Sequence, residues 1–75
     1  MTTLQKELQR LSGTTKDIVG AANTWAGTTG LDVTGALNVK AGNTSPNLKS
    51  LQGVLNQLAG TSGYAETEAA RRCTP

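Results

Sequence analysis

The stretch that decides the fold is TTGLDVTGALNVKAG at residues 28–42, because the chain contains similar phrases elsewhere. Residues 14–27 read TTKDIVGAANTWAG, and residues 63–71 read GYAETEAAR. Residues 51–63, LQGVLNQLAGTSG, share part of the same pattern. A phrase that returns roughly every 15 residues is too short for the common helical-repeat families, so it predicts one helix for each repeat.

Glycines end the repeated stretches. Gly13, Gly27, Gly42 and Gly60 close the phrases LSG, WAG, KAG and LAG. Glycine often follows the last turn of a helix, because it adopts the left-handed backbone conformation without a Cβ clash. These positions therefore predict four helix C-terminal caps.

Hydroxyl side chains mark the expected helix starts. Thr14 and Thr29 each precede an Asp by three residues, which resembles a capping box. Ser45 is expected to cap the fourth helix, with Pro46 as its first residue, because a missing N–H costs nothing there. Ser62 fills the cap position of a fifth unit.

Apolar residues recur at helical spacing between these signals. The longest stripe consists of leucines: Leu48, Leu51, Leu55 and Leu58. The expected helices cover about residues 3–12, 16–26, 31–41 and 46–59, with a weaker fifth at 64–72. The fold class that follows is all-α, a compact bundle of four to five short helices with Gly C-caps and Thr or Ser N-caps. Residues 1–75 form one small domain, of which 64–75 are a weaker terminal unit.

Two residue types also recur inside the expected helices. The first is glycine, at Gly20, Gly35 and Gly53. Since glycine in a helix interior costs about 1 kcal/mol, we expect a neighbouring backbone to approach closely there. The second is asparagine, at Asn23, Asn38 and Asn56. We expect these amides to bond backbone groups of the next turn; recognition of a partner or a glycan is the alternative.

The composition disfavours catalysis and metal binding. Charged residues form 16% of the chain, with a net charge of +2, no His and one cysteine, Cys73. A nucleophile lacks a histidine base, and no Cys/His cluster can hold zinc, so we expect no enzymatic activity, no catalytic residue, no cofactor and no metal. Glu66 and Glu68 with Arg71 and Arg72 are interpreted as a solvated helix face. No apolar run is long enough to span a membrane, and no signal peptide is visible.

The phrases WAGTTGLDVTGALNVKAGN and LQGVLNQLAGTSG resemble repeated units of small structural proteins from tailed phages of actinobacteria. Those units follow the pattern LNxLAGTTGL…GALNxxAG. The resemblance covers about residues 8–72, and the chain departs from the pattern at its end, where AARRCTP replaces the expected AG closure. It implies a virion protein, minor tail or head-associated, without enzymatic activity.

We therefore expect a structural component of a tailed-phage virion, made in the host cytoplasm and present in several copies, with a homo-oligomer as one option. Its partners are expected to be other virion proteins of the capsid or tail. The candidate contact residues are Trp25, Leu31, Val39, Tyr64, Ser45 and Pro46. Trp25 is equally compatible with a place in the core.

The alternative function is a small helical DNA-binding regulator, because short helices joined by a tight turn suggest a helix-turn-helix. Its recognition helix should carry basic and amide side chains together. Between Ile18 and Ala41 the second and third helices carry only Lys40 as a cation, against Asp32. Scattered positive charge therefore argues against nucleic acid as the partner.

Overall fold

The computed structural model describes residues 3–75, and within that range the chain forms five α-helices and no strand. They are α1 (Leu4–Ser12), α2 (Ile18–Ala26), α3 (Val33–Lys40), α4 (Leu51–Ala59) and α5 (Glu66–Arg71). The expected all-α bundle with one helix for each repeat is confirmed.

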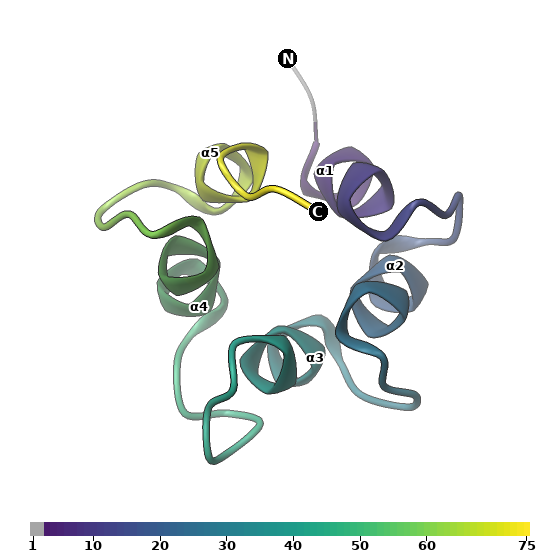
Figure 1. Ribbon diagram of the computed structural model, residues 1–75, viewed down its shortest axis with the longest axis horizontal. Helices are drawn as coiled ribbons and strands as arrows, with labels where there is room; N and C mark the ends of the chain where they lie inside the picture. Colours follow the sequence, from purple (N-terminus) through teal and green to yellow (C-terminus); the bar gives the residue numbers. More distant parts are fainter. Residues whose placement is uncertain (1–2) are drawn as a thin grey trace.

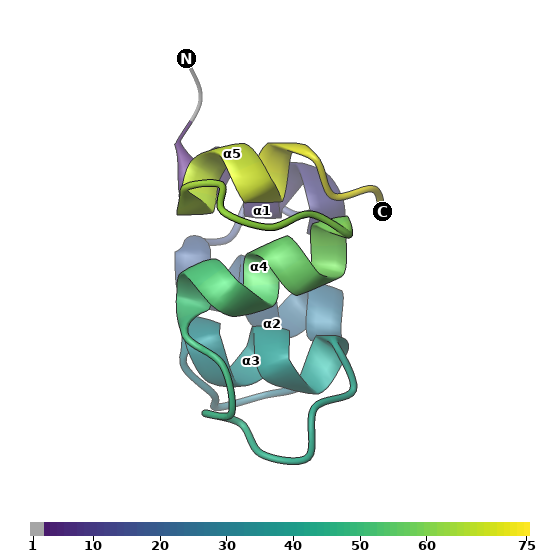
Figure 2. The same ribbon diagram turned by 90° about the vertical axis from the view of Figure 1, so that its left-hand side faces the viewer.

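The helices stand side by side in a closed ring (Figure 1). Each helix packs against the next one in the chain, and α5 packs against α1 to complete the circle. In Figure 2, α3, α4 and α5 all run from left to right, so neighbouring helices are parallel. Each connecting segment must therefore return along the outside of the ring. The result is a flat molecule of 28 × 26 × 16 Å, with helix N-termini on one face and C-termini on the other.

Glycine caps end the helices largely as expected. Gly13, Gly27 and Gly60 are the C-cap residues of α1, α2 and α4, with φ between 72° and 74°. In α3 the C-cap is Ala41 in the right-handed region, and Gly42 follows it with φ 80°. The left-handed residue turns the chain out of the helix and starts its return.

The predicted N-caps were wrong for α2 to α5. Thr14, Thr29, Ser45 and Ser62 all lie in connecting segments, well before the helix starts. The observed caps are Asp17, Asp32 and Ser50, whose side chains accept from the third helical N–H, and Ala65, which makes no such bond. Because the helices are parallel, each connecting segment runs back to the N-terminal face of the ring, and Thr14 and Thr29 lie within these segments. The cap is therefore the residue that reaches the N-terminal face, where a carboxylate also meets the positive dipole end.

The start predicted for the fourth helix was also wrong. Ser45 and Pro46 lie in a turn, and α4 begins only at Leu51. Leu48 falls outside the helix and is 56% exposed, although its helical spacing predicts a place in the leucine stripe. The segment between α3 and α4 has to cross the height of the ring. Its residues are therefore not helical, although their apolar side chains have helical spacing.

The ring is filled by apolar side chains that are small for a protein core. The buried apolar residues are Leu8, Leu11, Ala21, Ala22, Ala36, Leu37, Val54, Leu55, Ala69, Ala70 and Cys73. Five of these eleven residues are alanines, whose small side chains allow helices to pack closely.

Candidate functional site

A buried asparagine fastens each of the middle helices to the segment that follows it. Asn38 is fully buried. Its Nδ2 donates to the carbonyl oxygens of Thr34 at 2.9 Å and Lys49 at 3.0 Å. Its Oδ1 accepts from the Lys49 N–H at 3.1 Å and from Asn43 Nδ2 at 2.7 Å. The Asn38 side chain thus bonds both the turn that ends α3 and the connecting segment that leads back to α4. We call this arrangement an amide clip.

The same clip recurs in α2 and α4. Asn23 bonds both the N–H and the C=O of Leu31, and Asn56 bonds both groups of Tyr64. The hydroxyls of Thr28 and Thr61 donate to these asparagines, as Asn43 does to Asn38. The expected structural hydrogen bonding of the three asparagines is confirmed.

Sequence reasoning missed a fourth polar side chain of this kind, Gln9 in α1. Its Nε2 donates to the carbonyl oxygens of Thr15 at 3.4 Å and Lys16 at 2.8 Å. Gln9 lies six residues after the N-cap Thr3, as Asn23 does after Asp17. The spacing from the true N-cap was the signal that could have found it.

The glycines inside the helices make room for the caps, and the expected approach of a neighbouring backbone was wrong. The Gly35 N–H donates to Asp32 Oδ1 at 2.6 Å, and a Cβ there would lie 2.8 Å from the same oxygen. At Gly20 a Cβ would lie 2.9 Å from Lys16 Cβ. The cap side chain and the residue before it fold over this position, so the space is used within one repeat.

Two of the predicted contact residues belong to the clips. Leu31 and Tyr64 each give their backbone to an asparagine, and their half-buried side chains pack against the core. The Arg72 guanidinium lies 4.2 Å from the centre of the Tyr64 ring. Arg72 therefore makes a cation–π contact with the partly exposed ring of Tyr64.

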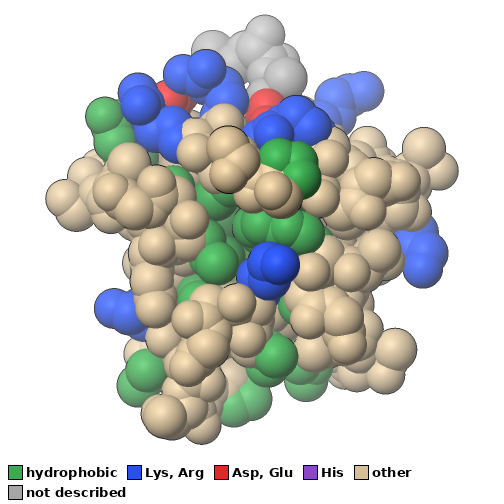
Figure 3. All heavy atoms as spheres, in the orientation of Figure 1, with side chains coloured by type: hydrophobic (Ala, Val, Ile, Leu, Met, Phe, Trp, Pro, Cys, Tyr) green, Lys and Arg blue, Asp and Glu red, His purple; other side chains and the backbone are tan. Residues whose placement is uncertain are grey.

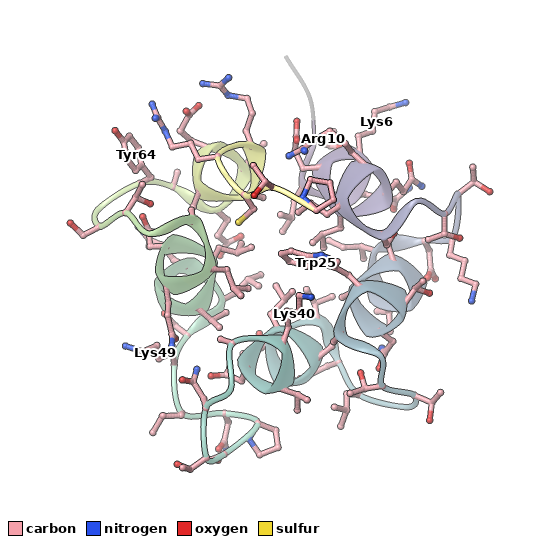
Figure 4. All side chains as sticks on the ribbon, viewed as in Figure 1. Lys6, Arg10, Trp25, Lys40, Lys49 and Tyr64 are labelled. Atoms are coloured by element: carbon pink, nitrogen blue, oxygen red, sulfur yellow. The ribbon has the colours of Figure 1, made fainter. Side chains whose placement is uncertain are left out.

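Trp25 points into the middle of the ring from α2, where Lys40 of α3 lies beside it (Figure 4). Lys40 Nζ is 5.1 Å from the ring centroid of Trp25. Trp25 is half-buried and packs against the core. In Figure 3, apolar side chains are visible at the centre of the C-terminal face, and a cationic side chain lies across them. Trp25 thus belongs to the core and also reaches the surface of this face.

Replacing Lys40 with Ala should uncover Trp25. We expect its fluorescence emission to move to longer wavelength, and the free energy of unfolding to fall by about 0.5–1 kcal/mol through loss of the cation–π contact. Because Trp25 is the only tryptophan, the emission spectrum reports this position alone. Lys49→Ala removes the same charge from a side chain that points away from the ring (Figure 4) and should leave the spectrum unchanged.

The other predicted contact residues lie on the outside. Val39 is 40% exposed on α3, Pro46 is exposed in the turn before α4, and Ser45 is half-buried beside it. The structure adds two exposed apolar side chains that sequence reasoning missed as surface residues, Val19 at 42% and Leu48 at 56%. Helical spacing had assigned Leu48 to a buried stripe.

The charged groups of α5 pair with one another at the surface. Arg71 donates to both carboxylate oxygens of Glu68, and Arg72 Nε lies 2.9 Å from the same side chain. The hydrogen bond from Arg71 lowers the pKa of Glu68. Cys73 is buried, and burial raises the pKa of its thiol, so the neutral form is favoured. The interpretation of Glu66, Glu68, Arg71 and Arg72 as a solvated helix face is confirmed, with Glu66 exposed and Glu68 paired with both arginines.

Among residues 3–75 the structure contains no pocket and no acidic, His and Cys cluster that could hold a metal ion. No helix in this range is long and apolar enough to cross a membrane. Every buried side-chain nitrogen or oxygen of the described residues has a hydrogen-bond partner. Comparison with protein-family models, with curated proteins and with solved structures finds no match to this chain.

Proposed function

We propose that the protein is a non-enzymatic structural component of a tailed-phage virion, minor tail or head-associated, that acts through protein–protein contacts. The observation that carries the proposal is how the repeated motif is used. Its caps, glycines and asparagines all bond within the chain, so the motif builds a framework. The resemblance of WAGTTGLDVTGALNVKAGN and LQGVLNQLAGTSG to units of phage structural proteins supports the same function.

Two outward positions can differ while the framework stays constant. Thr24 in α2 and Val39 in α3 stand seven residues after the N-cap, and both are exposed. These two positions can adapt to a partner without any change in the fold. A mostly neutral surface with isolated apolar side chains suits packing against other proteins in several copies.

The regulator hypothesis has less support. A helix-turn-helix places two helices at a large angle, with the second helix free to enter the major groove. Here α2 and α3 are parallel neighbours within a ring. The exposed side chains of α3 include Val39 and a single cation, Lys40. Neither feature resembles a recognition helix.

Mass spectrometry of purified virions from the phage that encodes this chain tests the proposal. We expect the protein at a fixed ratio to the major capsid protein, and the ratio distinguishes a head protein from a tail protein. Absence from virions, while the protein accumulates in infected cells, would contradict the proposal. Salt-dependent binding to duplex DNA would then support the regulator.

A surface variant tests the contact role of Val39. We expect Val39→Asp to reduce incorporation into virions about tenfold or more, because a charge buried without a partner in an interface costs several kcal/mol. The control is Thr24→Asp, which places the same charge at the equivalent exposed position of α2. Incorporation of a Val39→Asp variant, folded by circular dichroism, at the level of the unmodified protein would exclude Val39 from the contact.

A further inference from the structure

The last helix ends differently from the others. In α2, α3 and α4, the N–H groups of Thr28, Asn43 and Thr61 return to the carbonyl oxygen of the clip asparagine at 2.9–3.0 Å. In α5 the corresponding position, six residues after the N-cap Ala65, is Arg71, which carries no acceptor and pairs with Glu68. α5 has no glycine cap and no amide clip of its own. Its last turn is closed by the N–H groups of Arg72 and Cys73, which donate to the carbonyl oxygens of Glu68, Ala69 and Ala70. The carbonyl groups at its end also accept from side-chain donors.

Those donors come from the other end of the chain. Arg10 of α1 directs Nη2 at the carbonyl oxygens of Ala70 at 3.2 Å, Arg71 at 3.4 Å and Cys73 at 3.1 Å. Its Nε donates to Glu7 Oε1 at 3.0 Å, and Glu7 is buried. The carboxylate fixes the planar guanidinium so that its remaining donors face the end of α5.

Arg10 also occupies a defined place in the repeat. It stands seven residues after the N-cap, as Gln57 does in α4, and Gln57 reaches back to Asn43 in the turn that ends α3. Arg10 of α1 therefore bonds the end of α5 in the same way as Gln57 of α4 bonds the turn that ends α3. At this junction alone among the five, no chain segment connects the two helices, so side chains must provide the closure.

We propose that α5 is a conditional helix, which is folded only while Arg10 holds its carboxyl end, so that opening of the ring and unfolding of α5 are one event. α5 has six residues, which is too short to be stable in isolation. Its buried side chains include the small Ala69 and Ala70, which contribute little apolar area. Release would expose Leu8 and Leu11 of α1 and the tail, while α2 to α4 keep their own caps and clips.

Cys73 reports on the closed state. Its thiol is buried, with Sγ 3.5 Å from the Ala69 carbonyl oxygen and 3.8 Å from that of Leu55 in α4. Its own carbonyl accepts from Arg10. When α5 unfolds, the thiol becomes accessible to a reagent, and it is the only thiol in the chain.

The test compares Arg10→Ala with Lys6→Ala, which removes the same charge from an exposed side chain of α1 that points outward (Figure 4). Backbone amide exchange and the rate of thiol labelling are measured on the full chain without denaturant. In Arg10→Ala we expect both the exchange of α5 amides and the labelling of Cys73 to accelerate about 10- to 100-fold, the equivalent of one to two charge-assisted hydrogen bonds. Exchange in α2 to α4 should change less than about twofold. Arg10→Lys should fall between, because an ammonium cannot reach three carbonyls with a fixed fork.

Two results would overturn the proposal. The first is an acceleration shared equally by all five helices, because it would mean that α5 opens only with the whole fold. The second is an Arg10→Ala variant that matches Lys6→Ala. If Arg10→Ala does not fold, the unmodified protein decides, because α5 amides should exchange at least about tenfold faster than α2 and α3 amides under native conditions.

Discussion

Replacing Asn38 with Ala is expected to lower the free energy of unfolding by about 2–4 kcal/mol, a large part of the stability of a small domain. The substitution removes both hydrogen bonds to Lys49 and the acceptor for Asn43. It also leaves a space at a position with no solvent exposure. Urea denaturation followed by far-UV circular dichroism measures the change.

Two further variants sharpen this prediction. Asn38→Asp keeps the size of the side chain but replaces the donating nitrogen, which faces the carbonyls of Thr34 and Lys49, with an acceptor. It should therefore destabilise at least as much as Ala. Asn47→Ala, in an exposed turn, should change the free energy of unfolding by less than about 0.5 kcal/mol. If Asn38→Ala costs no more than Asn47→Ala, the clip does not hold the fold together.

Truncating Leu55 is the second change with a large expected effect. Leu55→Ala should lower the free energy of unfolding by about 2–5 kcal/mol, since the side chain is fully buried in the ring and leaves a cavity. Leu48→Ala, by contrast, should cost less than about 0.5 kcal/mol because that side chain lies in the exposed connection before α4. The two substitutions remove the same atoms, so denaturation curves of the pair isolate the effect of position.

The helical pattern alone groups Leu48 with Leu55, which makes this pair a direct test of the ring. If the leucines formed one buried stripe on a longer fourth helix, both substitutions would cost several kcal/mol. Equal losses would therefore contradict the observed start of α4 at Leu51. A third pattern, in which Leu48→Ala is the more costly, would require the connecting segment to be buried.

Local signals in the sequence determined which segments are helical and how they end. Gly13, Gly27 and Gly60 end helices because the left-handed conformation they favour is a property of one residue. The structural role of the asparagines was also predictable, because each bonds a carbonyl four residues earlier and a segment shortly after its own helix. Such interactions depend on spacing along the chain.

Tertiary structure decided the rest. The parallel order of the helices moved the N-caps from threonines to Asp17 and Asp32 and excluded Leu48 from the core, because each connection has to cross the height of the ring. The packing of α2 against α3 brings Lys40 to Trp25. Closure of the ring places Arg10 against the end of α5, 60 residues further along the chain, and no spacing rule reaches that far. The Arg10 contact exists only because five similar units, packed side by side, return to their starting point and bury their apolar faces against one another.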